Sequence, residues 1–278
     1  MDVSIVIVCW NGRDLLKKNL PTVIKSSHNS KNQIREILVI DDGSTDDSVV
    51  FLKENYPQIK LVEHKKNFGY AAGCNTGVKE AIGDLVVILN LDVAPSADFL
   101  EHALPHFEDK KVFAVSFNEG KFGPGKLEWQ DGFLQIIPTQ VVNQTSLTDW
   151  PSGGSSIFKK EIWQKLGGMD NLFLPFYFED MDLGIRARKG GYQCLWEPKS
   201  EVIHHHEASI NPQNFSQEYI DSIKQRNHLL LTWKNLDSKK ILIRHFFGLL
   251  KRILKHPRYL KVVFEAVDRV FFYKKERF

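Results

Sequence analysis

Runs of hydrophobic residues and segments with helical spacing alternate along the first hundred positions of the chain. Four runs are rich in β-branched and other apolar residues, which is typical of strands buried on both faces of a parallel sheet. The predicted strands are Val3–Cys9, Glu36–Ile40, Ile59–Glu63 and Leu85–Leu91. The segments between them favour helices. These are Asp14–Ser26, a segment capped by Asp46 or Asp47, and Asn75–Ile82.

This order of elements predicts an α/β fold with a doubly wound, mostly parallel sheet and right-handed crossovers. Ligands bind such sheets at the carboxyl ends of the strands. Polar groups stand at three of these ends, namely Asn11, the pair Asp41-Asp42, and Asn90–Asp92. We therefore expect a binding site along this edge of the sheet.

The pattern changes from about residue 112. Short strands are predicted at Phe113–Phe117 and Gly154–Phe158, whereas Asp131–Thr148 has little periodicity and is predicted to be a loop with a weak strand. Beyond Gln217 the spacing is helical. We therefore divide the chain into residues 1–111, 112–216 and 217–278, and we expect the middle part to pack against the sheet.

The composition places the chain among globular proteins. Of its 278 residues, 42% are hydrophobic and 26% are charged, which excludes disordered, collagenous and fibrous classes. The three cysteines form no Cys-x-x-Cys pair, so neither a disulfide framework nor a zinc ribbon is expected. The start lacks the positive charge of a signal peptide, and no apolar stretch reaches about 18 residues. These features favour a reducing, cytoplasmic setting without a transmembrane helix.

The net charge of +3 conceals an uneven distribution. The segment from Lys234 onward carries 13 Lys and Arg against 4 Asp and Glu, a net charge of +9, whereas residues 1–233 carry 24 against 30, a net charge of −6. Hydrophobic residues in the basic segment recur at helical spacing before and after His256-Pro257. Such helices are typical of segments that lie on a membrane surface or bind a polyanion, and a solvated helical face is the simpler interpretation.

Two motifs offer ligands for a divalent cation. Asn90 and Asp92 lie two positions apart at the end of a hydrophobic strand, so their side chains point to one side, where they suit Mg²⁺ or Mn²⁺ bound to a diphosphate. The alternative is that Asp92 is a turn or cap residue. His204, His205 and His206 follow another strand, and in an extended segment the first and third face the same way. Their number favours a metal ligand.

Two further motifs are candidates for ligand recognition. Asp41 and Asp42 would accept hydrogen bonds from a base or a ribose, although Asp-Gly sequences also form ordinary turns. Small residues recur along Asn67–Gly77, where they allow a ligand close to the backbone and to a helix N-terminus. Close packing of helix on sheet is the alternative. The sequence contains neither the dinucleotide fingerprint Gly-x-Gly-x-x-Gly nor a P-loop.

The segment Phe176–Arg186 places three carboxylates behind aromatic residues. In a helix, Glu179 and Asp182 share a face, and Asp180 projects elsewhere. Mutual repulsion and loss of solvent raise the pKa of a carboxyl group, which is what a general base requires. The alternative is an acidic helix N-terminus in which Arg186 pairs with Asp182.

Together these motifs resemble those of family 2 glycosyltransferases of the GT-A fold. The resemblance covers about residues 1–230, and the joint order of the motifs is more specific than any one of them. It is closest to the branch that is similar to rhamnosyl- and galactofuranosyltransferases of bacterial cell-surface polysaccharides. The motifs that carry it are Val3–Gly12, Asp41–Asp46, Asn67–Asn75, Asn90–Asp92, Ser152–Gly154, Phe178–Arg186 and the strand-end His204.

The resemblance implies an inverting transfer of a sugar from a nucleoside-diphosphate-sugar to a hydroxyl of a glycan or lipid-linked glycan, with Asp180 as the catalytic base. Asp92 and His204 would bind Mg²⁺ or Mn²⁺. Asn90 stands where the family usually has the first Asp of its Asp-x-Asp motif. The residues implied on the acceptor side are Gly153, Gly154, Glu179 and Asp182. Those implied to hold the donor are Cys9, Trp10, Asn11, Asp41, Asp42, Asn67, Gly69, Gly73 and Asn90.

On this interpretation residues 1–111 bind the nucleotide-sugar, 112–216 carry the acceptor side and the base, and 217–278 form basic amphipathic helices. The helices would place a cytoplasmic enzyme on the inner membrane surface, pack on the catalytic domain or form an oligomer, and they no longer suggest a nucleic-acid partner.

The alternatives are a nucleotide-sugar-binding protein without turnover and a nucleotidyltransferase on a similar sheet. The filled acidic positions favour an enzyme, and Arg13 alone does not make the basic phosphate loop of a nucleotidyltransferase. The missing fingerprint argues against a dehydrogenase. A glycoside hydrolase with two opposed carboxylates would not explain acidic residues at the strand ends.

Overall fold

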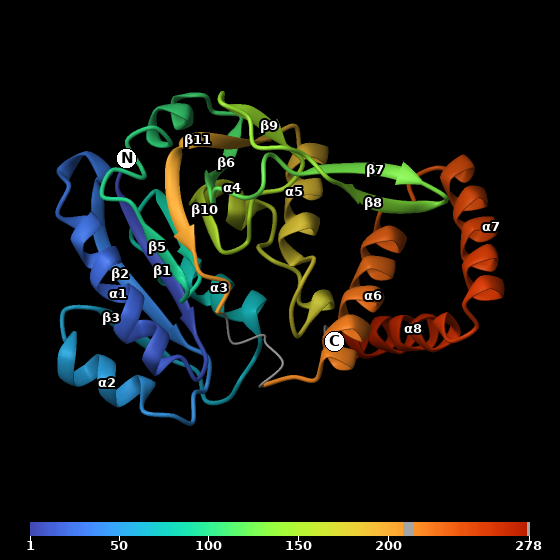
Figure 1. The fold of residues 1–278 in the computed structure, drawn as a ribbon, viewed down its shortest axis with the longest axis horizontal. Coiled ribbons are helices and arrows are strands. Elements are labelled where there is room, and N and C mark those ends of the chain that lie inside the picture. Colours follow the sequence, from blue (N-terminus) through green and yellow to red (C-terminus); the bar gives the residue numbers. More distant parts are fainter. Residues whose placement is uncertain (208–213, 277–278) are drawn as a thin grey trace.

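A mixed sheet of nine strands organises the described part of the chain, residues 1–207 and 214–276 of a computed structural model (Figure 1). Its strands are β1 (Val3–Cys9), β2 (Ile34–Asp41), β3 (Lys60–Glu63), β4 (Leu85–Leu89), β5 (Val93–Pro95), β6 (Val112–Asn118), β9 (Ser146–Thr148), β10 (Ser155–Lys159) and β11 (Gln193–His204). They lie in the order β3-β2-β1-β4-β10-β6-β11-β5, and β9 pairs with β11. The predicted α/β class is confirmed.

The strands β1 to β4 form the parallel half of the sheet and follow the predicted positions. β1 pairs in parallel with β2 on one side and with β4 on the other. The helices between these strands are α1 (Arg13–Ser27), α2 (Ser48–Asn55) and α3 (Tyr70–Glu80). α3 begins before the predicted start at Asn75, because the small residues interpreted as a loop pack the first turns of the helix onto the sheet.

The hydrophobic core lies on both faces of this parallel half. Side chains of a strand point alternately to opposite faces. Ile5 and Ile7 of β1 therefore share a cluster with α1, whereas Val6 and Val8 share one with α3. Every residue of β1 is buried, as its continuous apolar run predicted. This packing fixes the carboxyl end of β1, where the site forms.

The remaining strands and helices extend the sheet beyond β4. β10 runs antiparallel to both β4 and β6, and β11 runs parallel to β6. The helices of this part are α4 (Lys160–Lys165), α5 (Glu179–Lys189), α6 (Gln217–Lys234), α7 (Lys239–Lys255) and α8 (Tyr259–Glu276). Short 3₁₀ turns span Ser30–Asn32, Leu104–Glu108 and Asn171–Phe173.

A hairpin stands where the sequence analysis expected a loop. β7 (Lys126–Gln130) and β8 (Phe133–Ile137) pair in antiparallel register. Asp131 and Gly132 join them with φ angles of 49° and 81°, the left-handed conformation that two-residue hairpin turns use. The prediction of a loop with a weak strand for Asp131–Thr148 is therefore met only in part. The segment holds two short strands, β8 and β9, with a loop between them, and its Asp-Gly pair is itself a hairpin signal.

Three helices follow the sheet, as the spacing beyond Gln217 predicted. α6 contributes Leu229, Leu230 and Leu231 to a third hydrophobic cluster, and α8 packs beside it. α7 lies at the end of the molecule, next to the tip of the β7–β8 hairpin (Figure 1). Within the residues that the structure describes, no helix combines the length and the hydrophobicity needed to cross a bilayer.

Candidate active site

A cavity of about 300 Å³ opens at the carboxyl ends of β1 and β4, where the sequence predicted a binding edge. The predicted site residues that line it are Trp10, Asp42, Asn67, Gly69, Asn90, Asp92, Gly153, Gly154, Glu179, Asp180 and His204. Five predicted residues do not line it. These are Cys9, Asn11, Asp41, Gly73 and Asp182.

Asp42 holds the loop that forms one wall of this cavity. Its Oδ1 accepts hydrogen bonds from the Phe68 amide at 3.0 Å and from Nδ1 of His64 at 2.7 Å, and its Oδ2 accepts one from the Gly69 amide at 2.8 Å. Gly69 has a φ angle of 90°, and a Cβ there would collide with Leu174. Asp42 therefore shapes the cavity by fixing the backbone around Gly69.

Cys9 and Gly73, predicted to hold the donor, do not line this cavity. Cys9 is fully buried in the core, and burial is the main reason that the pKa of its thiol rises to about 12. Gly73 lies inside α3 against β1, where a Cβ would come within 2.6 Å of Val8 Cγ1. The alternative of close helix–sheet packing is therefore the correct one for Gly73.

Asn11 and Asp41 support the site from behind its wall. Asn11 Oδ1 accepts a hydrogen bond from the Thr45 amide at 2.7 Å, and Asp41 Oδ2 accepts one from the Ser44 amide at 3.0 Å. Both side chains thus stabilise the turn after β2, which is the role that turn chemistry offered as the alternative. They position Asp42 and the neighbouring loop rather than line the cavity.

Asp92 is buried at the end of β4, and its carboxylate lacks donors. Within residues 1–207 and 214–276, neither of its oxygens accepts a hydrogen bond, and both are shielded from solvent. Nε2 of His204 lies 3.3 Å from Oδ1 of Asp92. A buried carboxylate is costly unless a cation neutralises it. The surroundings of Asp92 therefore fit a metal ligand.

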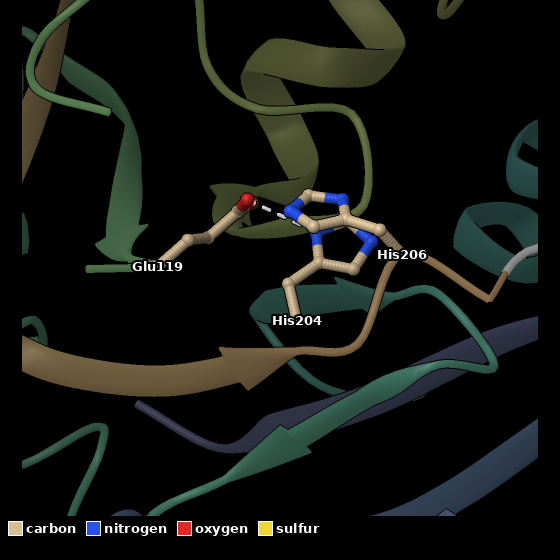
Figure 2. A group of neighbouring side chains, drawn as sticks. All are labelled: Glu119, His204 and His206. Carbon is tan, nitrogen blue, oxygen red and sulfur yellow. Dashed lines mark hydrogen bonds and ion pairs between the residues drawn. The ribbon is translucent and has the colours of Figure 1, made fainter. Parts of the chain in front are cut away.

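Glu119, which the sequence analysis did not select, completes a cluster with two of the predicted histidines (Figure 2). The ligand atoms of Glu119, His204 and His206 all lie within 4.8 Å of one another. The His204 ring stacks on that of His206 with centroids 4.3 Å apart, and its Nδ1 lies 3.0 Å from Oε2 of Glu119. Glu119 follows β6 as Asp92 follows β4, so the rule that selected one strand-end carboxylate also applies to the other.

His204 stands between two carboxylates. Burial by itself lowers its pKa, but the nearby carboxylates of Asp92 and Glu119 outweigh burial and raise the pKa to about 9. The space between these carboxylates therefore favours positive charge. Carboxylate oxygens and imidazole nitrogens are ligands for divalent cations, so the residues present fit the expected metal.

Glu179 and Asp180 begin α5 and face the cavity. The two preceding residues, Tyr177 and Phe178, have φ angles of 73° and 78°, which turn the chain sharply into the helix. Oδ2 of Asp180 accepts a hydrogen bond of 3.1 Å from the Gly153 amide. Burial raises the pKa of Asp180 to about 6, and burial together with the neighbouring Asp180 charge raises that of Glu179 to about 8. The predicted raised carboxyl pKa values are confirmed.

Asp180 lies between two cavities. Together with Ser152, it lines both the 300 Å³ cavity and a second cavity of about 210 Å³. The aromatic residues Phe122, Trp150 and Trp196 line the second cavity. One carboxylate thus borders two spaces that can hold different molecules.

Asn90 is fixed between β4 and β10. The backbone amide of Asn90 donates a hydrogen bond of 2.8 Å to the Gly154 carbonyl, and the side-chain Oδ1 lies 2.8 Å from the Tyr70 hydroxyl. That hydroxyl also lies 2.7 Å from the Gly153 carbonyl. A Cβ at Gly154 would collide with the Asn90 side chain. Tyr70, another residue that the sequence analysis missed, therefore positions Asn90 at the cavity.

Asp182 points away from the cavity. Its carboxylate pairs with Arg186 at 2.7 Å and with Lys234 of α6 at 2.7 Å, and it is almost fully buried. Asp182, predicted on the acceptor side, is thus held in these ion pairs and does not line the cavity. The pair with Arg186 is the alternative that the helical spacing offered, and the contact with Lys234 also joins α5 to α6.

The sheet edge, its acidic cavity and the strand-end cluster have the arrangement expected for the GT-A fold. The profile described as Glycosyl transferase family 2 matches residues 4–167. This is more than half of the chain, and the chain belongs to that family.

Curated relatives share about a quarter of their aligned residues with this chain. Poly-beta-1,6-N-acetyl-D-glucosamine synthase of Staphylococcus aureus (strain MW2) is 26% identical over 206 residues, which are 70% of this chain and 48% of that protein. N-acetylglucosaminyl-diphospho-decaprenol L-rhamnosyltransferase of Mycobacterium tuberculosis (strain ATCC 25618 / H37Rv) is 24% identical over 203 residues, which are 61% of this chain and 66% of that protein. The chain thus spans about half to two thirds of the length of these relatives.

Crystal structures of other glycosyltransferases share the fold. GalNAc-T7 with UDP, GalNAc and Mn²⁺ superposes with a TM-score of 0.69 at 17% identity, covering 86% of this chain and 49% of that one. The mannosyltransferase PcManGT from Pyrobaculum calidifontis, in complex with GDP-Man and Mn²⁺, gives a TM-score of 0.62 at 19% identity, covering 96% and 75%. The predicted GT-A fold is confirmed.

Proposed function

We propose that the chain moves a sugar from a nucleoside-diphosphate-sugar to a hydroxyl of a glycan or lipid-linked glycan, with inversion at the anomeric carbon. The observation that carries this proposal is the place of Asp180, which borders two cavities and has a raised pKa. A base that serves a transfer between two bound molecules needs access to both of them.

The larger cavity suits the donor. Trp10, Asp42 and Asn67 lie on the side of the cavity formed by the ends of β1 and β2, where base and ribose would bind. The diphosphate would then lie toward Asp92 and His204. In this arrangement the predicted residues that line the cavity keep their role in donor binding. Cys9, Asn11 and Asp41 do not line the cavity and stabilise the backbone around it.

Asp92, Glu119, His204 and His206 would hold a divalent cation next to the donor. A bound cation neutralises the charge that develops on the departing diphosphate. The mixture of carboxylates and imidazoles favours Mn²⁺ over Mg²⁺. The Mn²⁺ in GalNAc-T7 and PcManGT supports the same choice.

Asp180 would remove the proton of the acceptor hydroxyl. With a pKa of about 6, it is mostly ionised at neutral pH and still basic enough to accept a proton. The acceptor oxygen bonds to the anomeric carbon while the bond from that carbon to the diphosphate oxygen breaks, and its electron pair leaves with the nucleoside diphosphate. Attack from the face opposite the leaving group inverts the anomeric configuration. Glu179, with a pKa of about 8, is mostly protonated at neutral pH and does not compete as a base.

The second cavity suits the acceptor. Phe122, Trp150 and Trp196 offer flat apolar surfaces on which sugar rings can lie, while Asp180 and Ser152 provide polar groups at the boundary with the first cavity. Curated relatives that act in the synthesis of poly-N-acetylglucosamine and of a polyprenyl-linked saccharide support a role in cell-surface polysaccharide assembly.

The proposal is tested by incubating the protein with Mn²⁺, a panel of UDP-, GDP-, dTDP- and CMP-sugars, and polyprenyl-linked saccharide acceptors. We expect release of the nucleoside diphosphate from one donor, faster with acceptor than without, and a product whose anomeric configuration by NMR is opposite to that of the donor. Retention of configuration would contradict the mechanism. Tight donor binding without release with any acceptor would favour the binding protein, and release of pyrophosphate from a nucleoside triphosphate would favour the nucleotidyltransferase.

A further inference from the structure

α7 presents a row of large hydrophobic side chains to solvent. Leu242, Phe246, Leu250 and Leu254 follow one another at intervals of four residues and form a stripe along one face of the helix. These side chains are between 45% and 73% exposed. Figure 1 shows α7 at the extremity of the molecule, beyond the hairpin and α6. The stripe is therefore open along its length.

The opposite side of α7 is already packed and fixes the orientation of the stripe. His245 is buried, donates from Nδ1 to the Gly132 carbonyl at 2.8 Å, and accepts at Nε2 a hydrogen bond of 2.9 Å from the Trp233 indole. Gly248 lies against the hairpin turn, where a Cβ would collide with the Asp131 carbonyl. Because this side is committed to the hairpin and α6, the helix cannot rotate to bury the stripe within its own chain.

The charged residues of α7 are all basic. α7 contains six Lys and Arg and no Asp or Glu. Arg244, Lys251 and Lys255, together with Arg252, line a cavity of about 590 Å³ between α7 and the hairpin. Amphipathic helices with aromatic and leucine residues on one face and only cations on the other bind the interface of anionic bilayers.

α8 has an exposed hydrophobic row of its own. Leu260, Phe264 and Phe271 are between 43% and 65% exposed and lie at spacings of four and seven residues, on the same side of the helix. The buried side of α8, with Val262 and Ala266, packs in the cluster that contains α6. The two helices therefore expose hydrophobic side chains on a part of the chain with a net charge of +9.

We propose that α7 docks the protein on an anionic lipid bilayer by inserting the hydrophobic stripe that contains Phe246 and Leu254 into the interface, and that the exposed row of α8 contributes to this binding. A second copy of the chain is the less suitable occupant, since an α7–α7 contact would bring like charges together. Insertion in the plane of the interface needs neither the length nor the hydrophobicity of a spanning helix. This role goes beyond the proposed transfer, and vesicle binding is measured without donor or acceptor, so either proposal can fail alone.

The test is flotation of the full chain with phosphatidylcholine vesicles, with and without phosphatidylglycerol. We expect binding only to the anionic vesicles. Phe246→Ser should weaken binding about tenfold or more, because it removes the apolar surface that an inserted phenylalanine buries. Ile82→Ser, which removes a side chain that is 71% exposed on another part of the surface, is the matched control and should bind as the wild type does.

A second variant tests the charges independently of the stripe. Lys251→Glu/Lys255→Glu should lower binding to anionic vesicles by about tenfold or more, since each change replaces an attractive charge with a repulsive one. Circular dichroism melts establish that the variants are folded. Equal flotation of wild type and both variants would overturn the proposal. So would a dimer in sedimentation analysis that Phe246→Ser abolishes while vesicles bind no form of the protein.

Discussion

The backbone amide of Gly153 donates a hydrogen bond of 3.1 Å to Oδ2 of Asp180. It connects the loop before β10 to the start of α5, and thereby places the candidate base at the boundary between the donor and acceptor cavities. The same glycine packs so closely that a Cβ would lie 3.2 Å from Oδ2 and Cβ of Asp180. The position of the base therefore depends on a residue without a side chain.

Gly153→Ala should slow the transfer while leaving the fold intact. The added methyl group pushes Asp180 away from its hydrogen bond, and a small displacement of a catalytic group costs about tenfold to a hundredfold in rate. We expect kcat to fall and the KM for the donor to change little, as measured by initial rates. Gly190→Ala, at the other end of α5, is the control. If both variants kept the wild-type rate, the position of Asp180 would not depend on Gly153.

The rate of transfer should rise with pH through about 6 and then level off. Burial raises the pKa of Asp180 to about 6, and only the ionised form accepts a proton from the acceptor. Below that value the rate should fall about tenfold for each pH unit. A profile of kcat/KM against pH checks this. A rate independent of pH between about 4 and 7 would show that another group acts as the base.

Glu179→Gln should stabilise the protein at alkaline pH. The pKa of Glu179 is raised from 4.5 to about 8, so the folded state holds this proton more tightly than the unfolded state does. The contribution of Glu179 to the free energy of unfolding is complete below about pH 4.5 and is lost as pH rises through about 8. The variant should gain on the order of 2 kcal/mol over wild type at about pH 9 and little at about pH 4, by urea unfolding. Glu54→Gln, at an exposed position, should show no such pH dependence.

Glu119→Gln should weaken metal binding. Glu119 lies with His204 and His206 in the cluster of Figure 2, and loss of a ligand or of its hydrogen-bonded partner costs about tenfold to a hundredfold in metal affinity. Calorimetric titration with Mn²⁺ measures the change. Glu197→Gln is the matched control, because Glu197 also pairs with a histidine, His106 at 2.8 Å, outside the cluster. Equal affinities of the two variants would remove Glu119 from the metal site.

Phe122→Ala should affect the acceptor and not the donor. The Phe122 ring lines the second cavity and is 63% exposed, so its removal leaves the core intact. We expect the KM for the acceptor to rise about tenfold. This corresponds to a loss of about 1.4 kcal/mol of binding free energy, as expected when one apolar contact surface is removed. Initial rates at varied acceptor and fixed donor measure this effect. Val141→Ala serves as a control on the same stretch of chain, and an unchanged acceptor KM for Phe122→Ala would place the acceptor elsewhere.

The sequence predicted the sheet edge well because buried parallel strands have a strong signal. The continuous apolar run of β1 and the strand-end position of Asp92 are local features, and both lie where expected. The rise in the pKa of Glu179 and Asp180 has the expected direction, but burial is its main cause, and only Glu179 is also raised by its neighbour's charge. These features need only neighbouring residues in the chain and the rule that strand ends meet at one edge.

Long-range contacts explain what the sequence did not reveal. The carboxylate of Asp182 pairs at 2.7 Å with Lys234, which lies 52 positions later in the chain, and this contact is not evident from the local pattern around Asp182. Tyr70 reaches Asn90 and Gly153 across the cavity, a contact that no local pattern encodes. Gly73 is another example. A sequence does not distinguish a glycine that lets a ligand approach the backbone from one that lets a strand pack closely against a helix.

The transfer rate of Asp180→Asn tests the central claim most directly. Asparagine preserves the size of the side chain but cannot accept the proton of the acceptor hydroxyl at neutral pH. We predict that kcat falls by about a thousandfold or more, while the donor binds with unchanged affinity in a calorimetric titration with Mn²⁺. A variant that binds the donor normally and still transfers sugar at the wild-type rate would contradict the account.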